Sequence, residues 1–259
     1  KTWRMGRVLL CVAALFCLIF LLHPGGGAAD GLRFFVTFIV GALLSAWTGA
    51  AATMIATDAN VRTTVACARG SLNDGLRVAF AAGSAMSFTL VGAGLGGITL
   101  VFMSLRYAHS DAVALQSLSG LGLGASTAAL SARISGAIYV RAASLAADLM
   151  SKLEAEVAES DLDWRNPALI VRTAGTCGDV AGIAADYFES NVGSLLAAAA
   201  LANSDPDKVA LPFYLAGVGI LCSMMGYTFV STTSRGNGWI VKQKVLMWVL
   251  ERGLYSAGM

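Results

Sequence analysis

The chain has 259 residues, of which 56% are apolar and only 13% are charged, and its mean hydropathy is +0.69. This composition predicts an integral membrane protein that crosses the bilayer several times, rather than a water-soluble domain. The formal net charge of +2 is too small to suggest a nucleic-acid-binding protein. Since the sequence begins with Lys1 rather than Met, either a leader has been removed or the start is missing, and the sequence leaves both open.

Cysteine and histidine give no sign of a metal site. Five cysteines are scattered along the chain without CxxC or CxH spacing, and four of them fall in apolar runs, where Cys behaves as a small hydrophobic residue. His23 and His109 fall in candidate loops and have no partner at metal-ligand spacing. We therefore expect neither disulfides nor a cysteine- or histidine-bound metal.

Apolar runs of about 20 residues predict membrane-spanning helices. Six such runs occur in chain order, at residues 8–22, 34–57, 78–105, 120–143, 168–202 and 209–230. The first is short, and the fourth continues past the expected membrane boundary. The predicted fold class is therefore all-α, a polytopic membrane bundle of about six transmembrane helices.

The basic residues predict the orientation of these spans. They are concentrated before the first span, between the second and third, between the fourth and fifth, and after the sixth. The opposite side carries only Arg33, Arg106 and Lys208. By the positive-inside rule, both ends of the chain face the cytoplasm or its equivalent in an organelle.

Two glycine-rich stretches and the tail each allow two interpretations. "VGAGLGG" at 91–97 and "GLGLGAS" at 120–126 could suggest phosphate loops, but no strand precedes them and no GK[ST] follows. Small residues that let membrane helices approach closely are the better interpretation. The tail at 238–259 is either the start of a seventh span or an interfacial amphipathic helix with Trp239 and Trp248 at the headgroup level.

Several charged residues fall inside predicted spans, where charge is costly and usually marks a functional site or a buried pair. Arg133 lies at membrane depth in the fourth span, and Asp186 and Glu189 lie three residues apart on one helical face of the fifth. Further out, Arg141, Asp148 and Lys152 follow at steps of seven and four, and therefore share one face of the fourth helix.

Several separated motifs resemble the membrane-integral inorganic pyrophosphatases, the proton- or sodium-pumping family. "IATDANVRTT" at 55–64 is similar to the family's "IATYANVRTA", and "LRVAFAAGSAM" at 76–86 to its "FRVAFRSGAVM". The stretch 129–157, "RNPALIV" at 165–171 and "GDVAGIAADYFESNVGS" at 178–194 resemble further family motifs in family order. The resemblance covers about residues 34–230 and corresponds to the first half of the family fold. It divides the chain into an N-terminal span and loop (1–33), a pyrophosphatase-like domain (34–230) and a tail (231–259).

The resemblance implies a specific chemistry. In the family, two long helices extend into the cytosol and carry carboxylates that hold Mg²⁺ around pyrophosphate, while lysines bind the phosphate oxygens and a carboxylate-held water attacks. Here the matching phosphate-binding positions are Arg141 and Lys152. The matching metal-binding positions are Asp148, Asp161, Asp163 and Asp179, and Asp179 also matches the catalytic position. Arg133, Asp186 and Glu189 match the family's ion gate, for which a buried ion pair joining two helices is the simpler interpretation.

Three carboxylates of the family pattern are replaced in this chain. Ser144, Arg172 and Thr176 stand at acidic positions, and Asp179 aligns only after a one-residue deletion. The formal charge of the pocket therefore changes by about four units, and charges a few ångströms apart interact by several kcal/mol even at intermediate dielectric. From the sequence alone we expect the metal site to be lost, so that no cofactor binds.

Three functions follow as hypotheses from these observations. The preferred expectation is a catalytically inactive accessory subunit, surrounded by lipid and other membrane subunits. The alternative is half of a split, Mg²⁺-dependent ion pump that a second-half pyrophosphatase chain, or a homodimer, completes. A third hypothesis is conduction of ions or a small solute past Arg133, Asp186 and Glu189. The sequence is also compatible with being part of a longer chain.

Overall fold

The computed structural model describes residue 14 and residues 28–68, 72–153, 167–201, 206–230 and 243–258. In this part of the chain every regular element is an α-helix. The helices are, in chain order, α2 (Ala28–Ala68), α3 (Leu72–Ala108), α4 (Asp111–Leu153), α5 (Pro167–Leu201), α6 (Pro206–Phe229) and α7 (Gln243–Gly258). The predicted all-α fold is confirmed. The predicted span at 8–22 lies outside the described residues, except for Ala14.

Four of the described helices are long and apolar enough to cross a membrane: α2, α3, α4 and α6. Helix α5 has 35 residues, enough length to cross, but charged residues interrupt its apolar sequence at Arg172, Asp179, Asp186 and Glu189. The apolar C-terminal end of α5, "LLAAAAL", favours the membrane, while the charges of this helix require protein or water beside them. Length and composition together describe an integral, multi-pass membrane protein.

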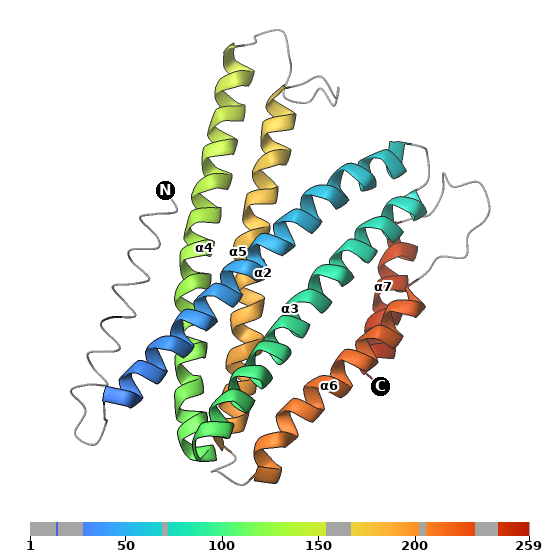
Figure 1. Cartoon of the computed structure of the whole chain (residues 1–259). Coiled ribbons are helices and arrows are strands. Elements are labelled where there is room, and N and C mark those ends of the chain that lie inside the picture. Colours follow the sequence, from blue (N-terminus) through green and yellow to red (C-terminus); the bar gives the residue numbers. More distant parts are fainter. Residues whose placement is uncertain are drawn as a thin grey trace.

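Two helices, α4 and α5, form a pair, and α2, α3 and α6 lie next to one another at an angle to it (Figure 1). Helices α4 and α5 run side by side and make the most extensive contact in the molecule. Helix α2 crosses this pair at an angle, α3 lies beside α2, and α6 lies beside α3 with α7 packed against its end. Helices α4 and α5 also extend beyond the others at one end, as the family resemblance implies for two long helices.

Glycines set the distance between α4 and α5. A Cβ at Gly182 of α5 would lie 2.9 Å from the Cα of Arg133, and a Cβ at Gly136 of α4 would lie 3.0 Å from the carbonyl oxygen of Gly178. The backbones of the two helices therefore touch, which only small residues permit.

The crossing of α2 and α4 depends on the same chemistry. A side chain at Gly41 or Gly124 would overlap the backbone carbonyl of Leu121 or Phe38 on the facing helix. The glycines of "GLGLGAS" are therefore a packing surface, as the sequence predicts. In "VGAGLGG", Gly94 and Gly97 likewise face neighbouring helices, whereas Gly92 and Gly96 border open space.

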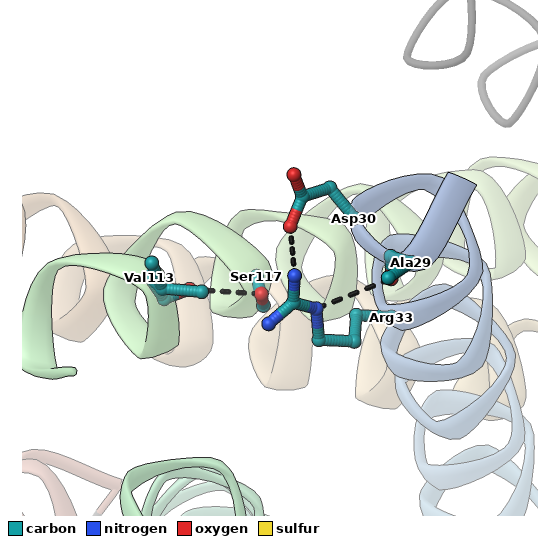
Figure 2. Close-up of polar contacts among 5 residues, drawn as sticks. All are labelled: Ala29, Asp30, Arg33, Val113 and Ser117. Carbon is teal, nitrogen blue, oxygen red and sulfur yellow. Dashed lines mark hydrogen bonds and ion pairs between the residues drawn. The ribbon is translucent and has the colours of Figure 1, made fainter. Parts of the chain in front are cut away.

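A polar junction lies at one end of this crossing, and Figure 2 shows the part of it formed by Arg33, Asp30 and Ser117. The Thr37 hydroxyl of α2 donates a hydrogen bond of 2.8 Å to the Ser117 carbonyl oxygen of α4. Arg33 extends from α2 toward Ser117; its guanidinium is ion-paired with Asp30, and its Nε donates to the Ala29 carbonyl at 3.1 Å. One of the few cations predicted on the non-cytoplasmic side is thus neutralised within its own helix.

The hydrophobic core lies where α2, α3, α4 and α5 meet. Its largest fully buried side chains include Ile98, Leu118, Leu121, Phe188 and Val192. By contrast, α6 is largely exposed, and its apolar side chains include Leu215, Leu221 and Met224. The described tail is helical, as both interpretations of it require: Gly253 of α7 lies against Val230 and Gly226.

Candidate functional site

The charges at membrane depth meet on the α4–α5 pair. The Arg133 guanidinium of α4 forms an ion pair with the Asp186 carboxylate of α5. The pair forms because Gly182, one turn before Asp186, brings the α5 backbone against Arg133 itself. The two residues expected as an ion gate or a buried pair therefore meet as an ion pair between two helices, although the described residues bury neither side chain.

Glu189 has a partner on the same two helices. The Ser126 hydroxyl of α4 donates a short hydrogen bond of 2.5 Å to the Glu189 carboxyl group. Ser126 precedes Arg133 by two helical turns, and Glu189 follows Asp186 by about one turn. Because α4 and α5 run in opposite directions, the two contacts lie one after the other along one seam. We call these four residues the charged seam.

The charged seam is not enclosed by the described residues. The side chain of Arg133 is 56% exposed and that of Asp186 is 42% exposed. Large apolar side chains of the same helices, Leu130, Ile134 and Tyr187, are exposed as well. Lipid is a poor neighbour for an ion pair, so this face is suited to contact with further protein or with water inside a protein.

Above the charged seam lie the predicted phosphate- and metal-binding residues of α4. Arg141, Asp148 and Lys152 are exposed, and their spacing places them on one face of the helix, as predicted. Asp179 of α5 is half-buried, and its backbone packs against Gly136 of α4. Asp179 therefore lies between the charged seam and Arg141 along the helix pair.

Of the three positions at which the family pattern has a carboxylate and this chain does not, the structure describes the side chain of Ser144 only. The Ser144 hydroxyl donates a hydrogen bond of 3.0 Å to the Val140 carbonyl of its own helix. Asp161 and Asp163 lie outside the described residues, as do the side chains of Arg172 and Thr176. Among the residues that the structure describes, no three carboxylate, His or Cys groups come together as a metal site. Since half of the predicted metal-binding carboxylates are not described, the arrangement of the complete set stays a prediction.

Sequence reasoning missed Ser126 as the partner of Glu189. A signal was present: Ser126 and Arg133 are seven residues apart, and Asp186 and Glu189 are three apart, so each pair shares a helical face. The register that brings these two faces together depends on the glycine contacts between the helices. A single sequence does not give that register.

The family model for "Inorganic H+ pyrophosphatase" matches residues 3–259 of this chain. The chain belongs to the inorganic H+ pyrophosphatase family. The match extends beyond residues 34–230, over which the motifs had shown the resemblance, and includes the first predicted span and the tail.

Individual members of the pyrophosphatase family are similar over most of this chain. A K(+)-insensitive pyrophosphate-energized proton pump 2 of Moorella thermoacetica is 39% identical over 201 residues, covering 75% of this chain and 29% of the relative. Corresponding proton pumps of Chloroflexus aurantiacus and Methanosarcina mazei are 36% and 34% identical, covering 86% and 90% of this chain and 29% and 33% of theirs. This chain therefore spans about a third of the length of these relatives.

Proposed function

We propose that this chain forms part of an ion-pumping membrane pyrophosphatase, in which further polypeptide, on the same or a separate chain, completes the active site. The observation that carries the proposal is the charged seam: a family member keeps an ion pair and a hydrogen-bonded glutamate at membrane depth, on a face that the described residues leave open. The relatives named as pumps support an active protein over the inactive subunit that the sequence alone favoured.

The resemblance gives α4 and α5 their chemical roles in this proposal. Arg141 and Lys152 bind phosphate oxygens, since a guanidinium and an ammonium both neutralise the charge of pyrophosphate. Asp148, Asp161, Asp163 and Asp179 supply carboxylate oxygens, the ligands that Mg²⁺ prefers. When bound, Mg²⁺ would neutralise charge on the diphosphate as the phosphoanhydride bond breaks.

The charged seam supplies the transport role. Glu189 can exchange a proton or coordinate a cation, and Ser126 holds its carboxylate in place with a short hydrogen bond. The Arg133–Asp186 pair lies between Glu189 and Asp179, so it separates the transport residue from the phosphate-binding end. An ion that passes this point must cross a fixed pair of opposite charges.

The second candidate is a catalytically inactive accessory subunit. It is motivated by Ser144, Arg172 and Thr176 at positions where the family pattern has carboxylates. The Ser144 hydroxyl already donates to its own helix, and a neutral hydroxyl is a weaker ligand for Mg²⁺ than a carboxylate. In this case the charged seam serves only to join α4 and α5.

A transport measurement distinguishes the two candidates. The chain, purified with everything that accompanies it in its native membrane, is reconstituted into vesicles, and pyrophosphate with Mg²⁺ is added outside. We expect ion uptake that Glu189→Gln lowers at least tenfold, because the amide neither exchanges a proton nor carries charge. Glu251→Gln on α7 is the matched control and should leave uptake unchanged. If the unsubstituted protein takes up neither H⁺ nor Na⁺ after pyrophosphate is added, the accessory role is the better account.

A further inference from the structure

We propose that an apolar groove on helices other than those of the charged seam binds an acyl chain of an anionic phospholipid. The groove lies between α3, α6 and α7 and has a volume of about 730 Å³, within the size range of small-molecule sites. Its walls include Phe80, Gly83 and Met86 of α3, Tyr227 of α6 and Leu254 of α7. This proposal is independent of the proposed pyrophosphatase activity.

The lining of the groove favours an apolar ligand. Most of it is aliphatic or aromatic, and the rings of Phe80 and Tyr227 stack with their centroids 5.7 Å apart. The Ser223 hydroxyl in the wall already donates a hydrogen bond of 2.8 Å to the Gly219 carbonyl. Glu251 is the only charged residue among the described residues of the lining. A hydrocarbon chain meets no unsatisfied polar group at Ser223 and gains contact with the ring pair.

Charge distinguishes the faces that meet lipid from those that meet protein. The face of α4 and α5 carries the Arg133–Asp186 pair and is unsuited to lipid. Helix α3 carries no charge from 78 to 105, and α6 carries none from 209 to 229. Both helices are apolar enough to span the membrane. Lipid is therefore the natural neighbour of the groove, while the further polypeptide of the relatives is the natural neighbour of the charged seam.

The residues beside the groove fit a phospholipid of the leaflet that the basic residues predict to be cytoplasmic. Arg77 lies one helical turn before Phe80, and the Arg252 guanidinium stacks over the Trp248 ring at 4.8 Å from its centroid. Arginine and tryptophan side chains are typical of the headgroup region. Asp74 and Glu251 are close in sequence to Arg77 and Arg252, so their carboxylates compete with a lipid phosphate for the guanidinium N–H donors. Each guanidinium has several N–H donors and can bind a phosphate as well.

A glycine pair provides a direct test. Gly83 and Gly92 both lie on α3, both are exposed, and an added Cβ meets no atom within 4 Å at either position. Of these two glycines, only Gly83 lines the groove. Gly83→Leu therefore places an apolar side chain in the groove with no clash at its Cβ, while Gly92→Leu makes the same change in helix propensity and apolar surface elsewhere on α3.

The measurement is native mass spectrometry of the protein purified in mild detergent with added phosphatidylglycerol, which counts the lipids retained per chain. We expect Gly83→Leu to lower retention at least fivefold, Gly92→Leu to leave it unchanged, and Arg252→Gln to reduce retention of phosphatidylglycerol more than that of phosphatidylcholine. Equal retention by Gly83→Leu and the unsubstituted chain would overturn the proposal. So would an absence of retained lipid in the unsubstituted protein, or a cross-link from Met247→Cys in the groove to another membrane polypeptide.

Discussion

Individual charges in this molecule are kept at membrane depth by partners on the neighbouring helix. Arg133 is paired with Asp186, and Glu189 accepts a hydrogen bond from Ser126. Removing one member of such a pair leaves the other charge without its partner, which is unfavourable inside a membrane. Stability at these positions should therefore depend on both residues together.

A double-mutant cycle measures this coupling. We expect Arg133→Gln and Asp186→Asn each to lower the free energy of unfolding in detergent, and the double variant to lose less than their sum. The coupling energy should be on the order of 1 kcal/mol, typical of residues in direct contact. Arg133→Gln combined with Asp74→Asn on α3 is the control and should be additive. Additivity in the Arg133–Asp186 cycle would show that the ion pair does not join the helices.

The sequence predicted the important charged residues of the spans but not all of their partners. Hydropathy places Arg133, Asp186 and Glu189 inside predicted spans. Because a charge inside a membrane is costly, the sequence identified these three residues as candidates for a functional site or a buried pair. The partner of Glu189 was missed since serines are common on membrane helices, and Ser126 carries no signal by itself. The expected loss of the metal site stays a prediction, because Asp161 and Asp163 lie outside the described residues.

At the scale of elements, close approach of backbones organises the bundle. Gly136 and Gly182 set the α4–α5 contact, and Gly41 and Gly124 set the crossing of α2 with α4. The sequence predicted the helices themselves, because long apolar runs leave few alternatives. It predicted glycines as packing surface, but not which helix each one meets: that depends on crossing angles and register, which several helices fix jointly.

Substitution at one of these contacts tests the role of the glycines. Gly182→Val places a branched side chain against the Arg133 backbone, and backbone cannot move aside as a flexible side chain can. We expect a loss of about 1–3 kcal/mol in the free energy of unfolding, as for other overpacked sites. The matched control is Gly193→Val on the same helix, where an added Cβ meets no atom within 4 Å. Thermal unfolding of both variants in detergent compares them, and equal midpoints would contradict tight packing at Gly182.

At the scale of the whole molecule, the described helices present one charged surface and one uncharged surface. The α4–α5 face presents the charged seam and is suited to further protein, while α3 and α6 present an uncharged surface suited to lipid. The chain covers about a third of the length of its relatives, and in the proposed function further polypeptide supplies the remaining groups of the active site. The sequence alone favoured loss of activity, because the substitutions at Ser144, Arg172 and Thr176 remove negative charge. Similarity to relatives named as pumps supports the proposed active alternative.

The most direct test of this account is Mg²⁺-dependent release of phosphate from pyrophosphate by the native material that contains this chain. We predict activity that requires Mg²⁺, that Asp179→Asn lowers at least a hundredfold, and that the control Glu251→Gln leaves intact. The asparagine side chain keeps the shape of the carboxylate but removes the charge that holds the metal. Material that contains all co-purifying polypeptides and releases no phosphate, or whose activity is unchanged by Asp179→Asn, would contradict the proposal that this chain is a working part of a pyrophosphatase.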